Sequence, residues 1–144
     1  ITAMDRAGKA ICGERISAIL YPRQPYKDEP PLNDKKISSV QNSQLSTVAV
    51  SVGAYDIFRS SGFKPDFVCG HSLGEYPALY ASGAFKSVDD LMELVCHRAF
   101  SMEEFAGKQG GKMAAVIGKG ADAIRPEADG VWLANCNSTK PVCS

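Results

Sequence analysis

The sequence has no excess of charge of either sign. Sixteen lysine and arginine residues balance sixteen aspartate and glutamate residues, and no run of five or six like charges occurs. Proteins that bind nucleic acid or an anionic membrane by electrostatic attraction carry such an excess, overall or on one face. The charge pattern therefore excludes nucleic acid as an expected partner and leaves small-molecule chemistry or protein contact.

Long hydrophobic runs are also missing. The apolar runs hold only a few residues, and the segment from Ile1 to Asp5 has neither the basic stretch nor the apolar core of a signal peptide. We therefore expect no membrane span and a cytoplasmic location.

Paired cysteines and metal-ligand spacings are absent too. No two of the five cysteines form a C-x-x-C pair, and neither histidine has the spacing of a metal site. The cysteines are Cys12, Cys69, Cys96, Cys136 and Cys143. This usage fits free thiols in a reducing cytosol, and we expect no metal.

The two ends of the chain look cut. It begins with isoleucine instead of methionine and stops in the β-prone run Pro141-Val142-Cys143-Ser144, with no closing element. Its 144 residues, 44% of them hydrophobic, suffice for one domain with a core of ordinary size. We expect a single domain that is truncated at both ends.

Three main helices are predicted from apolar spacing and from capping residues. Apolar residues recur with a period near 3.6 over residues 44–58, and residues 75–82 are compatible with a helix that stops at Gly83. A third helix starts near Ser87, which forms an S-x-x-D capping pattern with Asp90. Its expected apolar stripe is Val88, Leu91, Met92, Val95, Ala99 and Met102.

Short β-prone runs alternate with these helices. They predict strands over residues 67–69, 112–117 and 131–134, with a short helix near residues 121–124. Residues 21–31 are rich in proline and are expected to form an extended surface loop. The alternation predicts an α/β fold in which residues 67–69 form an inner strand of a parallel sheet.

A serine motif, Gly70-His71-Ser72-Leu73-Gly74, lies between the first predicted strand and a predicted helix. In that context G-x-S-x-G predicts a nucleophile elbow, a tight turn that exposes the serine hydroxyl. Both glycines are expected to make room for backbone that passes close to the strained turn. The Leu73 N–H, at the amino end of the helix, is the expected oxyanion donor. The alternative is a chance match to a short pattern.

A serine nucleophile needs a general base, and the chain has two histidines. His71 adjoins Ser72, so its side chain should leave the turn in another direction and pack or bond to backbone. It is kept as a candidate substrate-binding residue. His97 falls on a polar helix face and is expected to be solvated. The base is therefore expected beyond Ser144.

Arg98 is the other candidate substrate-binding residue. It projects from the edge of its helix's apolar stripe, and an antiparallel return of about 16 Å, after a climb of about 15 Å from Ser72, would bring it back to the elbow. A guanidinium there would hold the carboxylate of a dicarboxylic acyl group in a bidentate pair. The alternative is a surface arginine whose stem lies on the core, and spacing alone leaves both open.

Longer stretches around the motif resemble a known family. Residues 70–79 (GHSLGEYPAL) and 81–85 (ASGAF) resemble malonyl-CoA:acyl-carrier-protein acyltransferases of fatty acid and polyketide synthases. His97-Arg98 with Met102, residues 111–116 (GKMAAV) and residues 135–138 (NCNS) are similar to further motifs of that family. Residues 20–26 (LYPRQPY) and 44–46 (QLS) look like the acyltransferase domain of polyunsaturated fatty acid synthases.

The resemblance implies an architecture and residue roles. Residues 1–144 would be a partial acyltransferase domain, with residues 1–112 in an α/β-hydrolase-like core and residues 113–144 starting a small ferredoxin-like subdomain. Ser72 would be the nucleophile, the Leu73 N–H an oxyanion donor and Arg98 the clamp for the malonyl carboxylate. The family's second oxyanion donor would precede Ile1, and its catalytic histidine would follow Ser144.

The implied function is acyl transfer. A malonyl group would pass from malonyl-CoA through an ester on Ser72 to the phosphopantetheine thiol of an acyl carrier protein, within a multidomain synthase. The chain itself would bind no cofactor and would be inactive alone. An α/β-type serine hydrolase, such as an esterase or thioesterase, shares the elbow, although an arginine in the acyl pocket argues against it. A non-catalytic interaction module is the third possibility.

Overall fold

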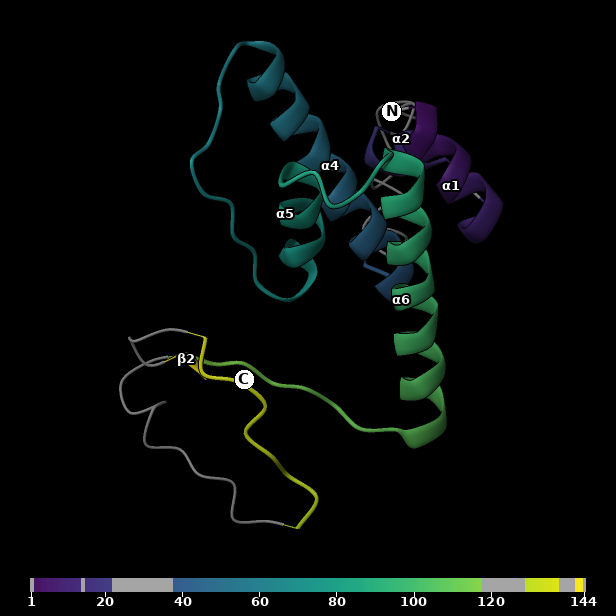
Figure 1. The fold of residues 1–144 in the computed structure, drawn as a ribbon. Helices are drawn as coiled ribbons and strands as arrows, with labels where there is room; N and C mark the ends of the chain where they lie inside the picture. The colour runs from purple at the N-terminus through teal and green to yellow at the C-terminus, as the bar shows by residue number, and fades with distance from the viewer. Residues whose placement is uncertain (1, 14, 22–37, 118–128, 138–141, 144) are drawn as a thin grey trace, which may run out of the picture. The chain divides into compact units, whose positions relative to one another are not determined.

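The computed structural model describes residues 2–13, 15–21, 38–117, 129–137 and 142–143. The chain forms two compact units, residues 1–108 and residues 109–144. Figure 1 shows that the described part of the first unit is built of helices. These are α1 (Thr2–Cys12), α2 (Ile16–Leu20), α4 (Val40–Ser60), the short 3-10 helix η1 (Ser72–Gly74), α5 (Glu75–Ala81) and α6 (Val88–Gln109).

The first two helices, α1 and α2, were not revealed by the sequence patterns. Gly13, directly after α1, has a φ of +74°, a conformation that glycine adopts without strain, and it ends the helix. The carboxylate of Asp5 then ties α1 to α2, because it accepts hydrogen bonds from the Ser17 N–H at 2.8 Å and from the Ser17 hydroxyl at 2.7 Å.

The predicted helix over residues 44–58 is confirmed as α4, which is longer at both ends. Ser39 caps it, since the Ser39 hydroxyl oxygen accepts a hydrogen bond from the Asn42 N–H at 3.2 Å. Leu45 and Val48 of the predicted apolar face are fully buried, but Phe58 is 61% exposed. The buried residues of the helix therefore lie between Gln44 and Val52, and its last turns are exposed.

The helix predicted from Ser87 is confirmed as α6. The expected cap is present, because the Ser87 hydroxyl oxygen accepts a hydrogen bond from the Asp90 N–H at 3.1 Å. The apolar stripe is buried from Leu91 to Ala99. Met102 is 46% exposed, although its sulfur lies 3.7 Å from Gln44 Nε2 of α4, so the stripe is buried only as far as Ala99. All residues of α6 after Ala99 are exposed, since the helix runs on past the elements that cover its first half.

One apolar core joins α1, α2, α4 and α6. The helix α5 packs against it through the half-buried rings of Tyr76 and Tyr80, and the elbow residue Leu73 does the same. The buried members are Met4, Ile16, Leu45, Val48, Ala49, Val52, Leu91, Met92, Val95 and Cys96. Each Leu, Ile or Val removed from water contributes about 1.5–3 kcal/mol, so this core supplies the main stabilisation of the first unit.

Residues 67–69, predicted as an inner strand, have no regular secondary structure, and Phe67 is 93% exposed. A strand needs a neighbour to complete its ladder of hydrogen bonds. Within the described residues no strand lies beside this run, so the strand prediction is wrong here. The parallel sheet remains a prediction.

Among the described residues of the second unit, β1 (Val116–Ile117) pairs antiparallel with β2 (Val142–Cys143). Only the last two residues of the strand predicted over 112–117 are therefore in a strand. The strand predicted over 131–134 is wrong, because these residues are irregular and Trp132 is 81% exposed. The short helix predicted near residues 121–124, and residues 22–31 of the predicted loop, lie outside the described residues.

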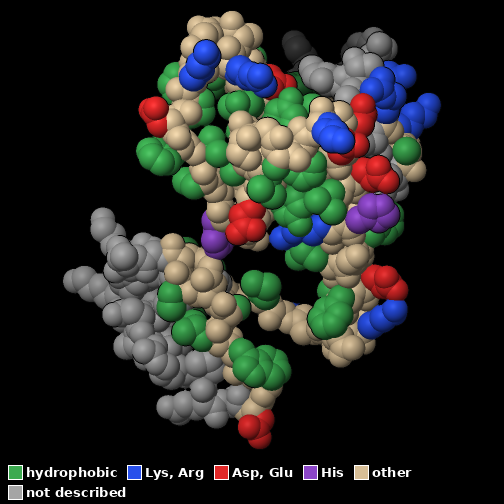
Figure 2. Space-filling view, in the orientation of Figure 1, with side chains coloured by type: hydrophobic (Ala, Val, Ile, Leu, Met, Phe, Trp, Pro, Cys, Tyr) green, Lys and Arg blue, Asp and Glu red, His purple; other side chains and the backbone are tan. Residues whose placement is uncertain are grey.

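Large hydrophobic side chains are exposed in both units. Figure 2 shows many of them on the drawn face, beside charged side chains. Among the large hydrophobic residues that the structure describes, Phe67, Met113 and Trp132 are the most exposed, at 93%, 82% and 81%. In the part of the chain that the structure describes, no helix is both long and apolar enough to cross a membrane.

Candidate active site

The turn that carries Ser72 is strained. Ser72 has a φ of +52°, and it is the only described residue other than glycine with a positive φ. This region is unfavourable for a residue with a β-carbon, and such strain often marks functional turns. The hydroxyl is exposed, and the chain passes at once into η1 and then α5. The sharp, exposed turn expected of an elbow is thus present, although no strand precedes it.

The two glycines of the motif differ. A β-carbon on Gly70 would lie 2.0 Å from the Gly74 carbonyl oxygen and 2.6 Å from the Glu75 nitrogen, so only glycine fits there. A β-carbon on Gly74 would meet nothing within 4 Å, and Gly74 has an ordinary φ of −66°. The expectation is confirmed for Gly70 and wrong for Gly74, whose backbone is the group that approaches Gly70.

The amino end of the helix lies at the elbow, as the oxyanion-donor prediction requires. The first hydrogen bond of this turn runs from the Gly74 N–H to the His71 carbonyl at 2.8 Å. The Leu73 N–H therefore precedes the first hydrogen-bonded donor, among the amides that a helix leaves without an internal acceptor. The Leu73 side chain packs on the core, which anchors this amide.

Arg98 reaches the elbow from α6. Its Nη2 donates a hydrogen bond to the Ser72 hydroxyl oxygen at 3.3 Å. The return of α6 along the core brings the two residues together, although they are 26 positions apart in sequence. Arg98 is half-buried, and its guanidinium is directed at the elbow. The adjacency is what the helix lengths predicted, while the role of Arg98 stays a prediction.

Two further residues hold the guanidinium in place. Nη1 of Arg98 donates a short hydrogen bond to Oε1 of Gln44, a side chain that is only 6% exposed. The Arg98 guanidinium carbon also lies 5.7 Å from the ring centroid of Tyr76, within the range of a cation–π contact. The sequence patterns did not predict that either residue contacts Arg98. Gln44 could have been noticed, because it stands four and eight residues before Val48 and Val52, on the buried face of α4.

Two tyrosines fasten α5, and with it the elbow, to α4. The Tyr55 hydroxyl donates to the Ala81 carbonyl at 3.0 Å, and the Tyr80 hydroxyl donates to Asp56 Oδ1 at 3.2 Å. Their rings meet edge to face, with centroids 6.1 Å apart. Burial, followed by the charge of Asp56, raises the pKa of Tyr80 above its ordinary value. Tyr80 therefore remains a protonated donor at neutral pH.

The two histidines differ in setting. His97 is on an exposed face of α6, with its Nε2 at 3.9 Å from Oε1 of Glu93, which matches the solvated position expected of it. His71 is exposed and precedes η1, where its carbonyl accepts the first hydrogen bond of the turn. Its role in substrate binding stays a prediction.

The other side chains considered for chemistry are cysteines and possible metal ligands. Cys69, next to the motif, is an exposed free cysteine. Among the residues that the structure places, no group of three His, Cys, Asp or Glu side chains could hold a metal ion.

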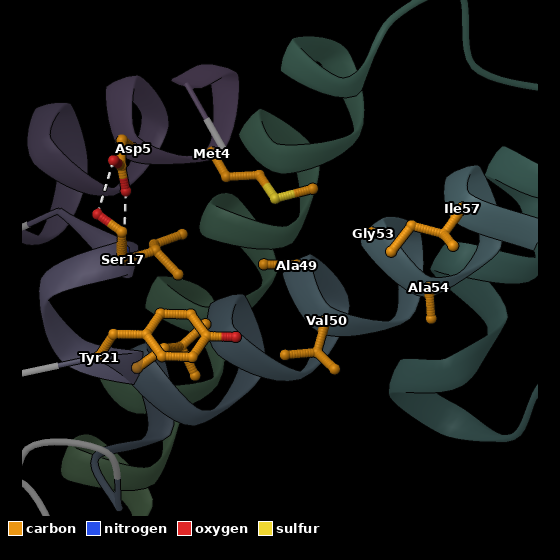
Figure 3. Close-up of a pocket in the computed structure, with 11 residues that line it drawn as sticks. Met4, Asp5, Ser17, Tyr21, Ala49, Val50, Gly53, Ala54 and Ile57 are labelled. Atoms are coloured by element: carbon orange, nitrogen blue, oxygen red, sulfur yellow. Dashed lines mark hydrogen bonds between the residues drawn. The ribbon is translucent and has the colours of Figure 1, made fainter. Parts of the chain in front are cut away.

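Two cavities lie apart from Ser72. The first, of about 320 Å³, is bordered by α1, α2 and α4, and Figure 3 shows the Asp5–Ser17 hydrogen bonds at its edge. The second, of about 510 Å³, lies around Arg6 and Asp89, which form a 3.1 Å ion pair. Neither cavity is lined by Ser72 or Arg98. Neither of these two cavities is therefore part of the candidate site.

Comparison with known proteins identifies the family of the chain. The family model described as the acyl transferase domain matches residues 1–144. The chain belongs to this family.

Relatives of this acyl transferase chain differ greatly in length. One subunit of the polyunsaturated fatty acid synthase of Thraustochytrium sp. is 48% identical over 145 residues, which cover 96% of this chain and 5% of that protein. Malonyl CoA-acyl carrier protein transacylase of Bacillus subtilis is 37% identical over 97 residues, which cover 67% of this chain and 30% of that protein. The chain thus matches less than a third of each. No solved structure matches it.

Proposed function

We propose that this chain forms the nucleophile-bearing part of a malonyl-CoA:acyl carrier protein transacylase. The observation that carries the proposal is the approach of the Arg98 guanidinium to the Ser72 hydroxyl, at 3.3 Å. A nucleophile beside a fixed cation suits an acyl donor that has a thioester at one end and a carboxylate at the other. The name of the Bacillus relative points to the same reaction, and the name of the Thraustochytrium relative points to fatty acid synthesis.

In the first half-reaction, the Ser72 hydroxyl oxygen attacks the thioester carbonyl carbon of malonyl-CoA. A carbon–oxygen bond forms, the hydroxyl proton passes to a general base, and the tetrahedral oxyanion is stabilised by the Leu73 N–H. The carbon–sulfur bond then breaks, and CoA leaves as a thiol after taking up the proton. The product is a malonyl ester on Ser72.

In the second half-reaction, the phosphopantetheine thiol of an acyl carrier protein attacks that ester. A carbon–sulfur bond forms, the ester carbon–oxygen bond to Ser72 breaks, and the thiol proton passes through the general base to the Ser72 oxygen. We place the general base on a histidine outside the chain, because His97 is solvated and His71 adjoins the nucleophile. On this proposal the chain alone is inactive and works within a larger synthase in the cytoplasm.

Arg98 is proposed to bind the malonyl carboxylate. A guanidinium offers five N–H donors in a planar fork, of which Gln44 occupies only one side. Ser72 adjoins the remaining side, so a bound carboxylate would keep the thioester carbonyl near the hydroxyl. An acetyl group has no such charge, and we therefore expect the site to prefer malonyl over acetyl donors.

The test uses a complete acyl transferase domain that includes this chain. Malonyl-CoA is expected to add one malonyl group to the protein, detected by mass spectrometry, and Ser72→Ala should abolish the addition. Arg98→Ala should lower kcat/KM for malonyl-CoA by about 10- to 100-fold, because a charge-assisted bidentate pair is lost. Acetyl transfer should be retained.

The outcome also separates the alternatives. Rapid release of free malonate without loading of the carrier protein would favour a serine hydrolase. Absence of any covalent adduct in the complete domain would favour a non-catalytic module. Unchanged malonyl selectivity in Arg98→Ala would remove Arg98 from the site.

A further inference from the structure

The ring of Tyr76 supports the guanidinium of Arg98. The guanidinium carbon lies 5.7 Å from the ring centroid. A cation within about 6 Å of an aromatic face is attracted by the ring quadrupole. Tyr76 is half-buried and packs against the core cluster, so the core restrains its ring.

Helix geometry explains why this support lies next to the nucleophile. Tyr76 is four residues after Ser72, in the first turn of α5. Helical side chains lean towards the amino end of their helix, so the side chain at position i+4 lies over the turn that holds position i. An arginine that stacks on Tyr76 is thereby brought to the hydroxyl of Ser72.

Gln44 and Tyr76 restrain different freedoms of the guanidinium. The buried amide of Gln44 fixes one edge, through Nη1, and the Gln44 amide nitrogen is itself 3.7 Å from the Met102 sulfur. The guanidinium carbon lies over the ring of Tyr76, which would restrain rotation of the guanidinium plane. Together they direct the remaining edge, which carries Nη2, at Ser72. Gln44 without Tyr76 would leave the plane free to rotate.

We propose that Tyr76 is a positioning residue that sets the plane of the Arg98 guanidinium and so gives the site its selectivity for acyl groups with a terminal carboxylate. The inference rests on the proposed function of Arg98. Because η1, which holds Ser72, continues directly into α5, which holds Tyr76, the nucleophile and the support of the cation move together. The aromatic face, and not the tyrosine hydroxyl, is the group that acts.

Steady-state kinetics of the complete domain with malonyl-CoA and acetyl-CoA provide the test. Tyr76→Leu is expected to raise KM for malonyl-CoA about fivefold, with little change in kcat or in KM for acetyl-CoA. Tyr76→Phe keeps the ring face and should keep malonyl selectivity. Pentafluorophenylalanine at position 76 keeps the shape but reverses the ring quadrupole, and should behave like leucine.

Tyr80→Leu is the matched control. Tyr80 is on the same helix and bonds to Asp56 instead of Arg98, so its loss should leave the ratio of the malonyl to the acetyl KM unchanged. In an Arg98→Ala background, Tyr76→Leu should cause no further loss of selectivity. Equal changes for both donors in Tyr76→Leu, or normal selectivity with the fluorinated ring, would overturn the proposal.

These results also separate this proposal from the proposed function. If the unaltered domain shows no preference for malonyl, the role of Arg98 fails. If the unaltered domain prefers malonyl, Arg98→Ala removes that preference and Tyr76→Leu does not, then only the role of Tyr76 fails.

Discussion

Gly70 lies against the backbone of the residues that follow Ser72. An added β-carbon would be 2.0 Å from the Gly74 carbonyl oxygen. The obstructing atoms belong to the backbone, so they cannot move aside as a flexible side chain would. We predict that Gly70→Ala lowers the free energy of unfolding by about 3 kcal/mol, measured by urea denaturation.

Gly74→Ala is the matched control for this prediction. Nothing lies within 4 Å of its added β-carbon, and φ is −66°. Its free energy of unfolding should stay within about 0.5 kcal/mol of the unaltered chain. Equal losses in the two variants would show that the close approach at Gly70 does not exist.

Much of the candidate site at the residue scale follows from the sequence. The G-x-S-x-G pattern predicts the turn at Ser72, and helix lengths predict the return of Arg98. Gln44 and Tyr76 were missed because their contacts depend on side-chain rotamers and on how α4 and α5 pack. Spacing along one helix does not determine either.

At the scale of elements, the contact between α1 and α2 depends on the charge of Asp5. Burial alone would raise the pKa of Asp5, but the hydrogen bonds from Ser17 and the charge of Arg15 outweigh it and lower the pKa below its ordinary value. A carboxylate whose pKa is lower in the folded state stabilises the fold above its unfolded pKa, about 3.9. That stabilisation is lost as the pH falls through the lowered pKa.

We therefore predict that Asp5→Asn weakens the dependence of stability on acid. Between pH 7 and about pH 3, the unaltered chain should lose more free energy of unfolding than the variant, measured by urea denaturation at each pH. Ser17→Ala should lower stability at pH 7 by about 1 kcal/mol, because the hydroxyl donor is lost. A parallel pH dependence in Asp5→Asn and the unaltered chain would contradict this account.

The helices were easier to predict than the strands. The apolar period and cap of α6 are local, and they gave its start correctly, as did the period of α4 for its centre. Residues 67–69 have β-prone side chains, but pairing depends on residues distant in sequence, and no paired strand adjoins them among the described residues. The two helices before residue 21 were missed because helices this short depend on packing against the core more than on local signals.

At the scale of the whole molecule, the shared core of four helices sets the stability of the first unit. Leu91 is at its centre and is 0% exposed, while Leu94, less than one turn later on α6, is 45% exposed. We predict that Leu91→Ala lowers the free energy of unfolding by about 2–5 kcal/mol. The comparison variant, Leu94→Ala, should lose less than about 1 kcal/mol.

Urea denaturation followed by circular dichroism would measure both leucine variants, because the first unit is helical. Similar losses in the two would mean that α6 does not present its Leu91 face to α4.

The left-handed backbone at Ser72 has a consequence for how mutations should be interpreted. This left-handed conformation is unfavourable for serine, so the Ser72 hydroxyl keeps its position only while the surrounding atoms hold the turn in its strained form. Substitutions at residues that do not contact a substrate, such as Gly70→Ala, can therefore abolish the reactivity of Ser72 although the serine itself is unchanged.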